Sequence, residues 1–203
     1  MKLSKYTTLF LCLGLLMLSC GNEEDDFDCL DLNANIGDQC TDDLDDVGQI
    51  GLDCECVSGI LDRISHIDAP PIYIDLGITE NSFLYFDVEP LSNGHFVSVR
   101  PGLDVQILDS STFGYPDALE LGDIISEASA WSTETNFVLV TSVGSAGSFE
   151  DAGERYLGFK ITDNEDIYYG WVSLENNTAS TAFYINRFWI NYNSGEFIEA
   201  GED

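Results

Sequence analysis

Four cysteines are the residues of this chain best suited to covalent chemistry: Cys29, Cys40, Cys54 and Cys56. Their spacing is C-x10-C-x13-C-x-C, which lacks the C-x2-C pairs typical of structural zinc. An even number favours two disulfides, with three connectivities open. Because Cys54 and Cys56 are too close in sequence to pair comfortably, we expect both to bond back to Cys29 and Cys40. A disulfide-bonded module is therefore the preferred interpretation, and zinc is the alternative.

Carboxylates crowd the same segment, where residues 21–56 hold thirteen Asp or Glu and no Lys or Arg. Carboxylate oxygens are the ligands that Ca²⁺ prefers. An EF-hand is excluded, because Val47 occupies an oxygen-ligand position and Cys54 stands where the bidentate Glu should be. Calcium remains the one cofactor that the sequence leaves open, although a solvated acidic loop is the preferred interpretation. The candidate calcium ligands are Asp42, Asp43, Asp45, Asp46 and Asp53.

Cys20 stands where an uncharged, mostly apolar run, residues 7–19, meets an acidic segment. That run is shorter than the roughly 20 apolar residues that cross a bilayer, and Lys2 and Lys5 precede it, so residues 1–19 are predicted to be a signal peptide. The ending LMLSC resembles a bacterial lipobox. This resemblance implies cleavage before Cys20 and acylation of its thiol and new amine. An ordinary signal peptide with an incidental cysteine is the alternative.

The acidic tether after Cys20, residues 20–28, resembles the surface-export signals of Bacteroidetes-type lipoproteins. The resemblance implies a lipid anchor in the outer membrane, facing the cell exterior. A merely solvated tether is the alternative. The formal net charge of −30 argues against nucleic acid and against docking on anionic lipid, since both need Lys and Arg. A basic partner or a cation remains open.

The Cys-rich module, residues 29–59, shows no helical stripe and no long strand. It resembles a short cysteine module of Bacteroidetes surface lipoproteins that carries G-x-x-C-D-D-G-D-P and ends in C-x-C-x-G. The Gly-Asp-Pro turn of that pattern is replaced here by Leu44-Asp45-Asp46. The matching positions are Gly37, Cys40, Asp42, Asp43, Asp45, Cys54, Cys56 and Gly59.

The composition and pattern of the sequence change after the stiff Ala69-Pro70-Pro71 segment, which we take as a domain boundary. Short runs rich in Val, Ile, Tyr and Phe follow, separated by turn sequences such as SNG and DNED. No βαβ alternation is present. These patterns predict an all-β fold over residues 67–203, an antiparallel, jelly-roll-like β-sandwich of eight or nine strands. For residues 119–131, a strand with a loop is preferred over a short helix.

The C-terminal third resembles a β-sandwich segment that closes many secreted bacterial proteins. The resemblance implies fold and extracellular placement, and it implies no activity. The aromatic-x-Gly-Phe, Tyr-Gly-Trp and I-x-A-G parts of that pattern are matched by Tyr156, Gly158, Phe159, Tyr169, Gly170, Trp171, Trp189, Tyr192, Ile198, Ala200 and Gly201.

No catalytic pattern emerges from the sequence. The two histidines, His66 and His95, have no Cys or His at ligand spacing, and no G-x-S-x-G motif is present. We therefore expect no enzyme. Two hypotheses remain: a cell-surface protein with a structural or interaction role, which is preferred, and a surface module that binds polysaccharide through exposed aromatics.

Three aromatic residues, Trp171, Trp189 and Tyr192, are the candidate ligand-binding residues for the second hypothesis. Core packing is the default for aromatic side chains. Strand alternation places Trp189 and Tyr192 on opposite faces of one strand. It does the same for Tyr168 and Trp171. At most one member of each pair can therefore face solvent.

Overall fold

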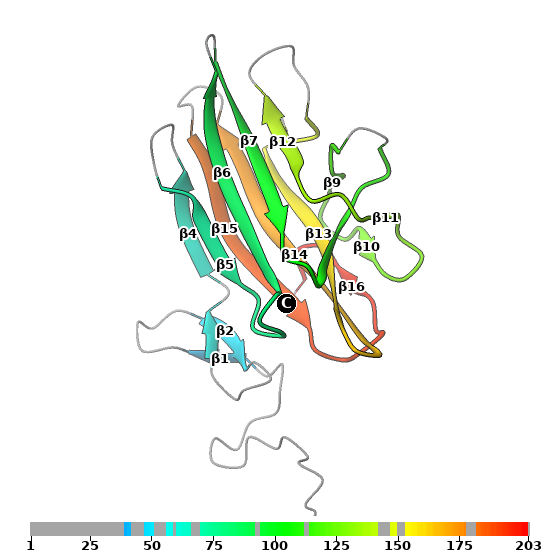
Figure 1. The fold of residues 1–203 in the computed structure, drawn as a ribbon. Coiled ribbons are helices and arrows are strands. Elements are labelled where there is room, and N and C mark those ends of the chain that lie inside the picture. The colour runs from blue at the N-terminus through cyan, green and yellow to red at the C-terminus, as the bar shows by residue number, and fades with distance from the viewer. Residues whose placement is uncertain are drawn as a thin grey trace, which may run out of the picture.

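The computed structural model describes residues 39–41, 47–50, 56–58, 60–65, 70–91, 94–111, 114–141, 147–149, 153–177 and 182–202 (Figure 1). Lipidation at Cys20, the five candidate calcium ligands, and Cys29 and Cys54 lie outside the described residues. Cys40 and Cys56 are described only as positions in a small antiparallel sheet of β1 (Gln39–Thr41), β2 (Val47–Ile50) and β3 (Cys56–Ser58). The predicted disulfides therefore stay predictions.

Two antiparallel sheets form the body of the fold, which confirms the predicted all-β class (Figure 1). The larger sheet contains β4 (Ile60–Ser65), β8 (Val105–Leu108), β9 (Ala118–Leu119), β11 (Trp131–Ser132), β13 (Glu154–Asp163), β14 (Asp166–Asn177) and β15 (Ala182–Asn191). Its order is β11-β8-β13-β14-β15-β4, with β9 paired to β13. The smaller sheet has the order β12-β7-β6-β5. Its strands are β5 (Ile72–Asp75), β6 (Phe83–Leu91), β7 (Gly94–Pro101) and β12 (Phe137–Thr141).

Alternation of apolar and polar residues builds the main core between the two sheets. In β5, Ile72 and Ile74 are buried while Tyr73 and Asp75 face outward. Leu84, Phe86 and Val88 of β6 extend the same buried layer. The register of β15 shifts by one residue between Ile185 and Arg187, so its buried positions change from odd to even numbers there. From the opposite sheet, this core takes alternate residues of β13, β14 and β15: Leu157, Phe159, Ile161, Tyr168, Val172, Leu174, Phe183, Ile185, Phe188 and Ile190.

The hairpin of β13 and β14 follows from its turn sequence. Asp163 pairs with Asp166, so only Asn164 and Glu165 connect the strands. Asn164 has φ of 52°, a left-handed conformation that Asn tolerates better than most residues. Gly170 at the centre of β14 permits a close approach, as its sequence position predicts. A Cβ built there would lie 2.6 Å from the Trp189 carbonyl oxygen and would overlap the Phe159 ring.

A third layer covers part of the outer face of the larger sheet. It consists of the short pair β10 (Ile124–Ile125) and β16 (Ile198–Glu199) with their flanking loops. The predicted strand-with-loop over residues 119–131 is confirmed, because this segment holds β10 and no helix. Beneath the layer is a second core of Leu108, Leu119, Ile125, Tyr156, Tyr169, Trp171, Ile198 and Ala200.

The larger sheet begins upstream of residue 67, where the sequence placed the start of the sandwich. Strand β4 pairs with β15, with Tyr184 opposite Ile64 and Phe183 opposite Ser65. The Ala69-Pro70-Pro71 segment, at which the sequence predicts the start of the sandwich, lies between β4 and β5. A pairing between residues more than 100 positions apart leaves no local signal in the sequence. In the described part of the chain, no helix is long and apolar enough to cross a membrane.

Candidate functional site

Trp171 is a core residue rather than a ligand platform. Its side chain is 0% exposed, and its Nε1 donates a hydrogen bond to the backbone carbonyl of Glu202 at 3.1 Å. Tyr156 packs edge-on against the indole, with ring centroids 5.3 Å apart. The Arg187 guanidinium lies 5.2 Å from the ring centroid. The candidate ligand-binding role of Trp171 is therefore wrong, because the third layer covers the face on which a sugar or peptide would stack.

Trp189 and Tyr192 lie on opposite faces, as alternation predicts. Trp189 is half-buried and packs against the second core, while Tyr192 is half-buried against the main core. Trp189 pairs directly with Trp171 across β14 and β15. The structure therefore does not bring the three predicted aromatic residues together into one ligand surface.

Lys160 and Glu127 lie beside the second core, next to two stacked aromatic rings. The rings of Trp131 and Tyr169 stack with centroids 5.8 Å apart, and Lys160 Nζ lies 5.1 Å from the Trp131 centroid. Burial lowers the pKa of Lys160, and the nearby Glu127 carboxylate opposes this by raising it. Burial also raises the pKa of Tyr169, with a smaller contribution from Glu127.

On the face of the larger sheet that lines the main core, burial raises the pKa of Tyr168, and the carboxylates of Asp166 and Asp163 raise it further.

These shifts predict a loss of stability at alkaline pH. Tyr168 and Tyr169 hold their protons more tightly in the folded state, so their contribution is complete below the ordinary pKa of 10.0 and disappears as pH rises through their folded pKa values. Lys160 acts in the opposite direction. The folded state binds its proton less tightly than the unfolded state does, so the contribution of Lys160 to stability rises with pH up to the ordinary pKa of 10.5. Tyrosinate absorbance should show a late phase that the double variant Tyr168→Phe, Tyr169→Phe lacks. A late phase that survives in this variant would contradict the assignment.

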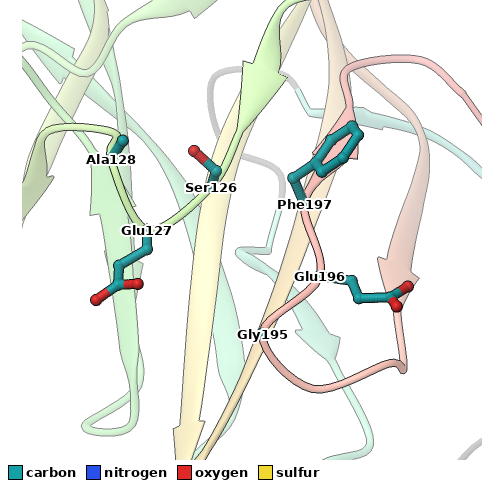
Figure 2. A pocket seen from close by; sticks show the side chains of 6 residues that line it. All are labelled: Ser126, Glu127, Ala128, Gly195, Glu196 and Phe197. Carbon is teal, nitrogen blue, oxygen red and sulfur yellow. The ribbon is translucent and has the colours of Figure 1, made fainter.

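An open hollow lies beside the third layer. Ser126, Glu127 and Ala128 line one side, and Gly195, Glu196 and Phe197 line the other (Figure 2). Its volume of about 560 Å³ falls in the range of ligand sites. However, Glu127, Ala128 and the three residues of the second side are all exposed, so the hollow does not enclose a small molecule. Its two carboxylates and its exposed ring suit contact with a larger partner.

Three exposed apolar side chains gather around β10 and β16, and we call them the apolar ribbon: Leu121, Ile124 and Phe197. They are 71%, 59% and 56% exposed. Ile124 pairs with Glu199, while Ile125 pairs with Ile198 and turns inward. Ile124 therefore lies on the outer side of a strand pair whose inner side is core, and Leu121 and Phe197 flank that pair along the chain.

A signal for the ribbon was present in the sequence. The doublets Ile124-Ile125 and Phe197-Ile198 each place two large apolar residues in succession. A two-residue strand can bury only one member of such a doublet. The other member must face outward or contact another element.

The described residues contain no group of three or more His, Cys, Asp or Glu side chains that could hold a metal ion. No family model, curated protein or solved structure matches this chain. The function must therefore be argued from the surface itself.

Proposed function

We propose that this protein is a lipid-anchored protein of the bacterial outer membrane that faces the cell exterior and binds a partner protein through the apolar ribbon. The observation that carries the binding proposal is the exposure of Ile124 on β10 and of Leu121 and Phe197 in the segments that flank β10 and β16. The anchor rests on Cys20 at the end of its apolar run and on the acidic tether that follows. The proposed role is interaction, with no catalytic step.

The ribbon has the makeup of a binding hot spot. Interfaces draw most of their energy from a few large side chains, with aromatic residues prominent among them. Phe197 supplies an aromatic anchor, and it also lines the hollow that could receive a side chain of the partner (Figure 2). Exposed apolar residues grouped in this way on a soluble domain typically mark an interaction site.

Charge indicates which kind of partner fits. Exposed acidic residues surround the ribbon, and they are Glu120, Asp123, Glu127, Glu196 and Glu202. Glu199 adds a half-buried carboxylate opposite Ile124. A partner with Lys or Arg around an apolar contact would complement this rim. A second copy of the chain is disfavoured, because each copy carries a net charge of −30 and would bring the same acidic rim.

Photo-crosslinking on intact cells tests this proposal. A photoreactive amino acid at Ile124 should give a reproducible adduct with one envelope protein, and Phe197→Asp should reduce the adduct at least about tenfold. Because Phe197 is exposed, its substitution should change the free energy of unfolding by no more than about 0.5 kcal/mol.

Leu103 provides the matched control position. It is 86% exposed and lies in the turn between β7 and β8, outside the ribbon. The same photoreactive group at Leu103 should not capture the partner. Equal adducts at Leu103 and Ile124, or adducts at Ile124 that persist in Phe197→Asp, would exclude the ribbon as the binding surface.

A further inference from the structure

The outer face of the smaller sheet carries a row of aromatic side chains. In the register, Tyr73 of β5 lies opposite Tyr85 of β6, and Tyr85 lies opposite Arg100 of β7. Phe83 sits two residues before Tyr85 and therefore shares its face. Figure 1 places this sheet as the front layer, with no described element drawn over its outer side. The aromatic row thus spans β5 and β6, with Arg100 of β7 beside it, on a face over which no described element is drawn.

The rings of this row are close together and partly exposed. Tyr73 is 48% exposed, and Phe83 and Tyr85 are half-buried. The Tyr73 and Phe83 centroids are 5.2 Å apart, with an angle of 31° between the ring planes. The two rings are tilted and packed against each other, and with Tyr85 on the same face they form an apolar strip. The main core lies on the other side of the strands, so this strip does not contribute to the core.

Charged groups hold the strip in place and add hydrogen-bonding capacity. The Arg100 guanidinium lies 4.6 Å from the Tyr85 centroid, and its NH2 contacts Asp87 Oδ2 at 3.2 Å. Tyr85 is therefore fixed between its strand neighbours and a stacked cation. Asp75 lies opposite Phe83.

We propose that this face, formed by Tyr73, Phe83, Tyr85 and Arg100, is a binding platform for a neutral polysaccharide chain. The C–H faces of sugar rings pack on aromatic rings, and their hydroxyl groups need donors and acceptors at the edge of the same surface. Arg100 donates, and the carboxylates of Asp75 and Asp87 accept. An exposed sheet face admits an extended chain at any point along its length, which a closed pocket does not.

Charge selects a neutral chain over an acidic one. Asp75, Asp87 and Glu89 all lie on this face, and the one guanidinium is paired with Asp87. Uronate or sulfate groups would meet these carboxylates and the net charge of −30. This proposal goes beyond the partner-binding role of the apolar ribbon. It involves a different sheet and different residues, so either proposal can fail without the other.

Affinity electrophoresis of the full-length protein in detergent tests the platform. The gels contain one soluble neutral polysaccharide each (hydroxyethyl cellulose, xyloglucan, glucomannan or soluble starch) or polygalacturonate as the acidic probe. We expect retardation by at least one neutral polysaccharide and none by polygalacturonate. Tyr73→Ala and Tyr85→Ala should each weaken the binding about tenfold or more. Tyr85→Phe should keep most of it, because the ring face remains.

Phe197→Ala is the control for a non-specific effect, since it changes the apolar ribbon and should leave retardation unchanged. Thermal melting of Tyr73→Ala checks folding, because this half-exposed residue can be removed with little loss of core. Lack of retardation by all four neutral polysaccharides would overturn the proposal. So would retardation that survives the double variant Tyr73→Ala, Tyr85→Ala. Capture of a protein by a photoreactive group at Tyr73, without polysaccharide binding, would reassign the face to a protein partner and overturn it as well.

Discussion

Replacing Trp171 with alanine is expected to lower the free energy of unfolding by about 3 to 5 kcal/mol. The indole is fully buried in the second core, and Tyr156 packs against its edge. Removal of the ring would leave a cavity and would abolish the hydrogen bond from Nε1 to the Glu202 carbonyl. Because a domain of this kind is stable by about 5 to 15 kcal/mol, the variant should be largely unfolded or melt at a much lower temperature.

Urea denaturation followed by fluorescence and circular dichroism measures this effect. Trp171→Phe should be less damaging, since it keeps an apolar ring and loses part of the volume and the hydrogen bond. Phe197→Ala removes a large aromatic side chain from an exposed position and should cost no more than about 0.5 kcal/mol. A Trp171→Ala protein with the unfolding midpoint of the parent would show that the third layer does not cover the ring.

Local alternation is the reason why much of the sandwich could be predicted. The buried and exposed positions of β5 follow directly from Ile72, Tyr73, Ile74 and Asp75. Parity likewise predicted that Trp189 and Tyr192 lie on opposite faces, and each does pack on a different core. These features depend on residues next to each other in the chain, so the sequence contains them.

The second core could not be predicted. Alternation along a strand assigns each residue to one face of the sheet, but it does not tell which other segment covers that face. Trp171 is buried by a segment about 30 residues downstream, around β16, and a contact over such a distance leaves no local signal in the sequence. The same limit applies to β4, whose partner β15 is distant in sequence. The aromatic row of Tyr73, Phe83 and Tyr85 could not be predicted either, since it depends on the register of β5 against β6. Its signal was the repeated aromatic at alternate positions of residues 83–85.

Replacing Cys20 with serine is expected to release the protein from membranes. A serine hydroxyl cannot form the thioether through which a lipoprotein is modified, so the acyl chains would have no attachment site. Each buried CH2 of such a chain contributes about 0.8 kcal/mol, and one chain alone gives only marginal binding. Loss of all chains should therefore move the protein almost completely from the detergent phase to the aqueous phase on temperature-induced partitioning.

Cys12→Ser is the matched control for this experiment. Cys12 lies within the apolar run, and the proposed cleavage before Cys20 would remove it, so its substitution should leave partitioning unchanged. A labelled fatty acid should be incorporated into the parent and into Cys12→Ser, and absent from Cys20→Ser. This readout is needed because an uncleaved signal peptide could hold a precursor at the membrane without any lipid. A Cys20→Ser protein that still incorporates the label would place the lipid on another residue, and the anchor assignment to Cys20 would be wrong.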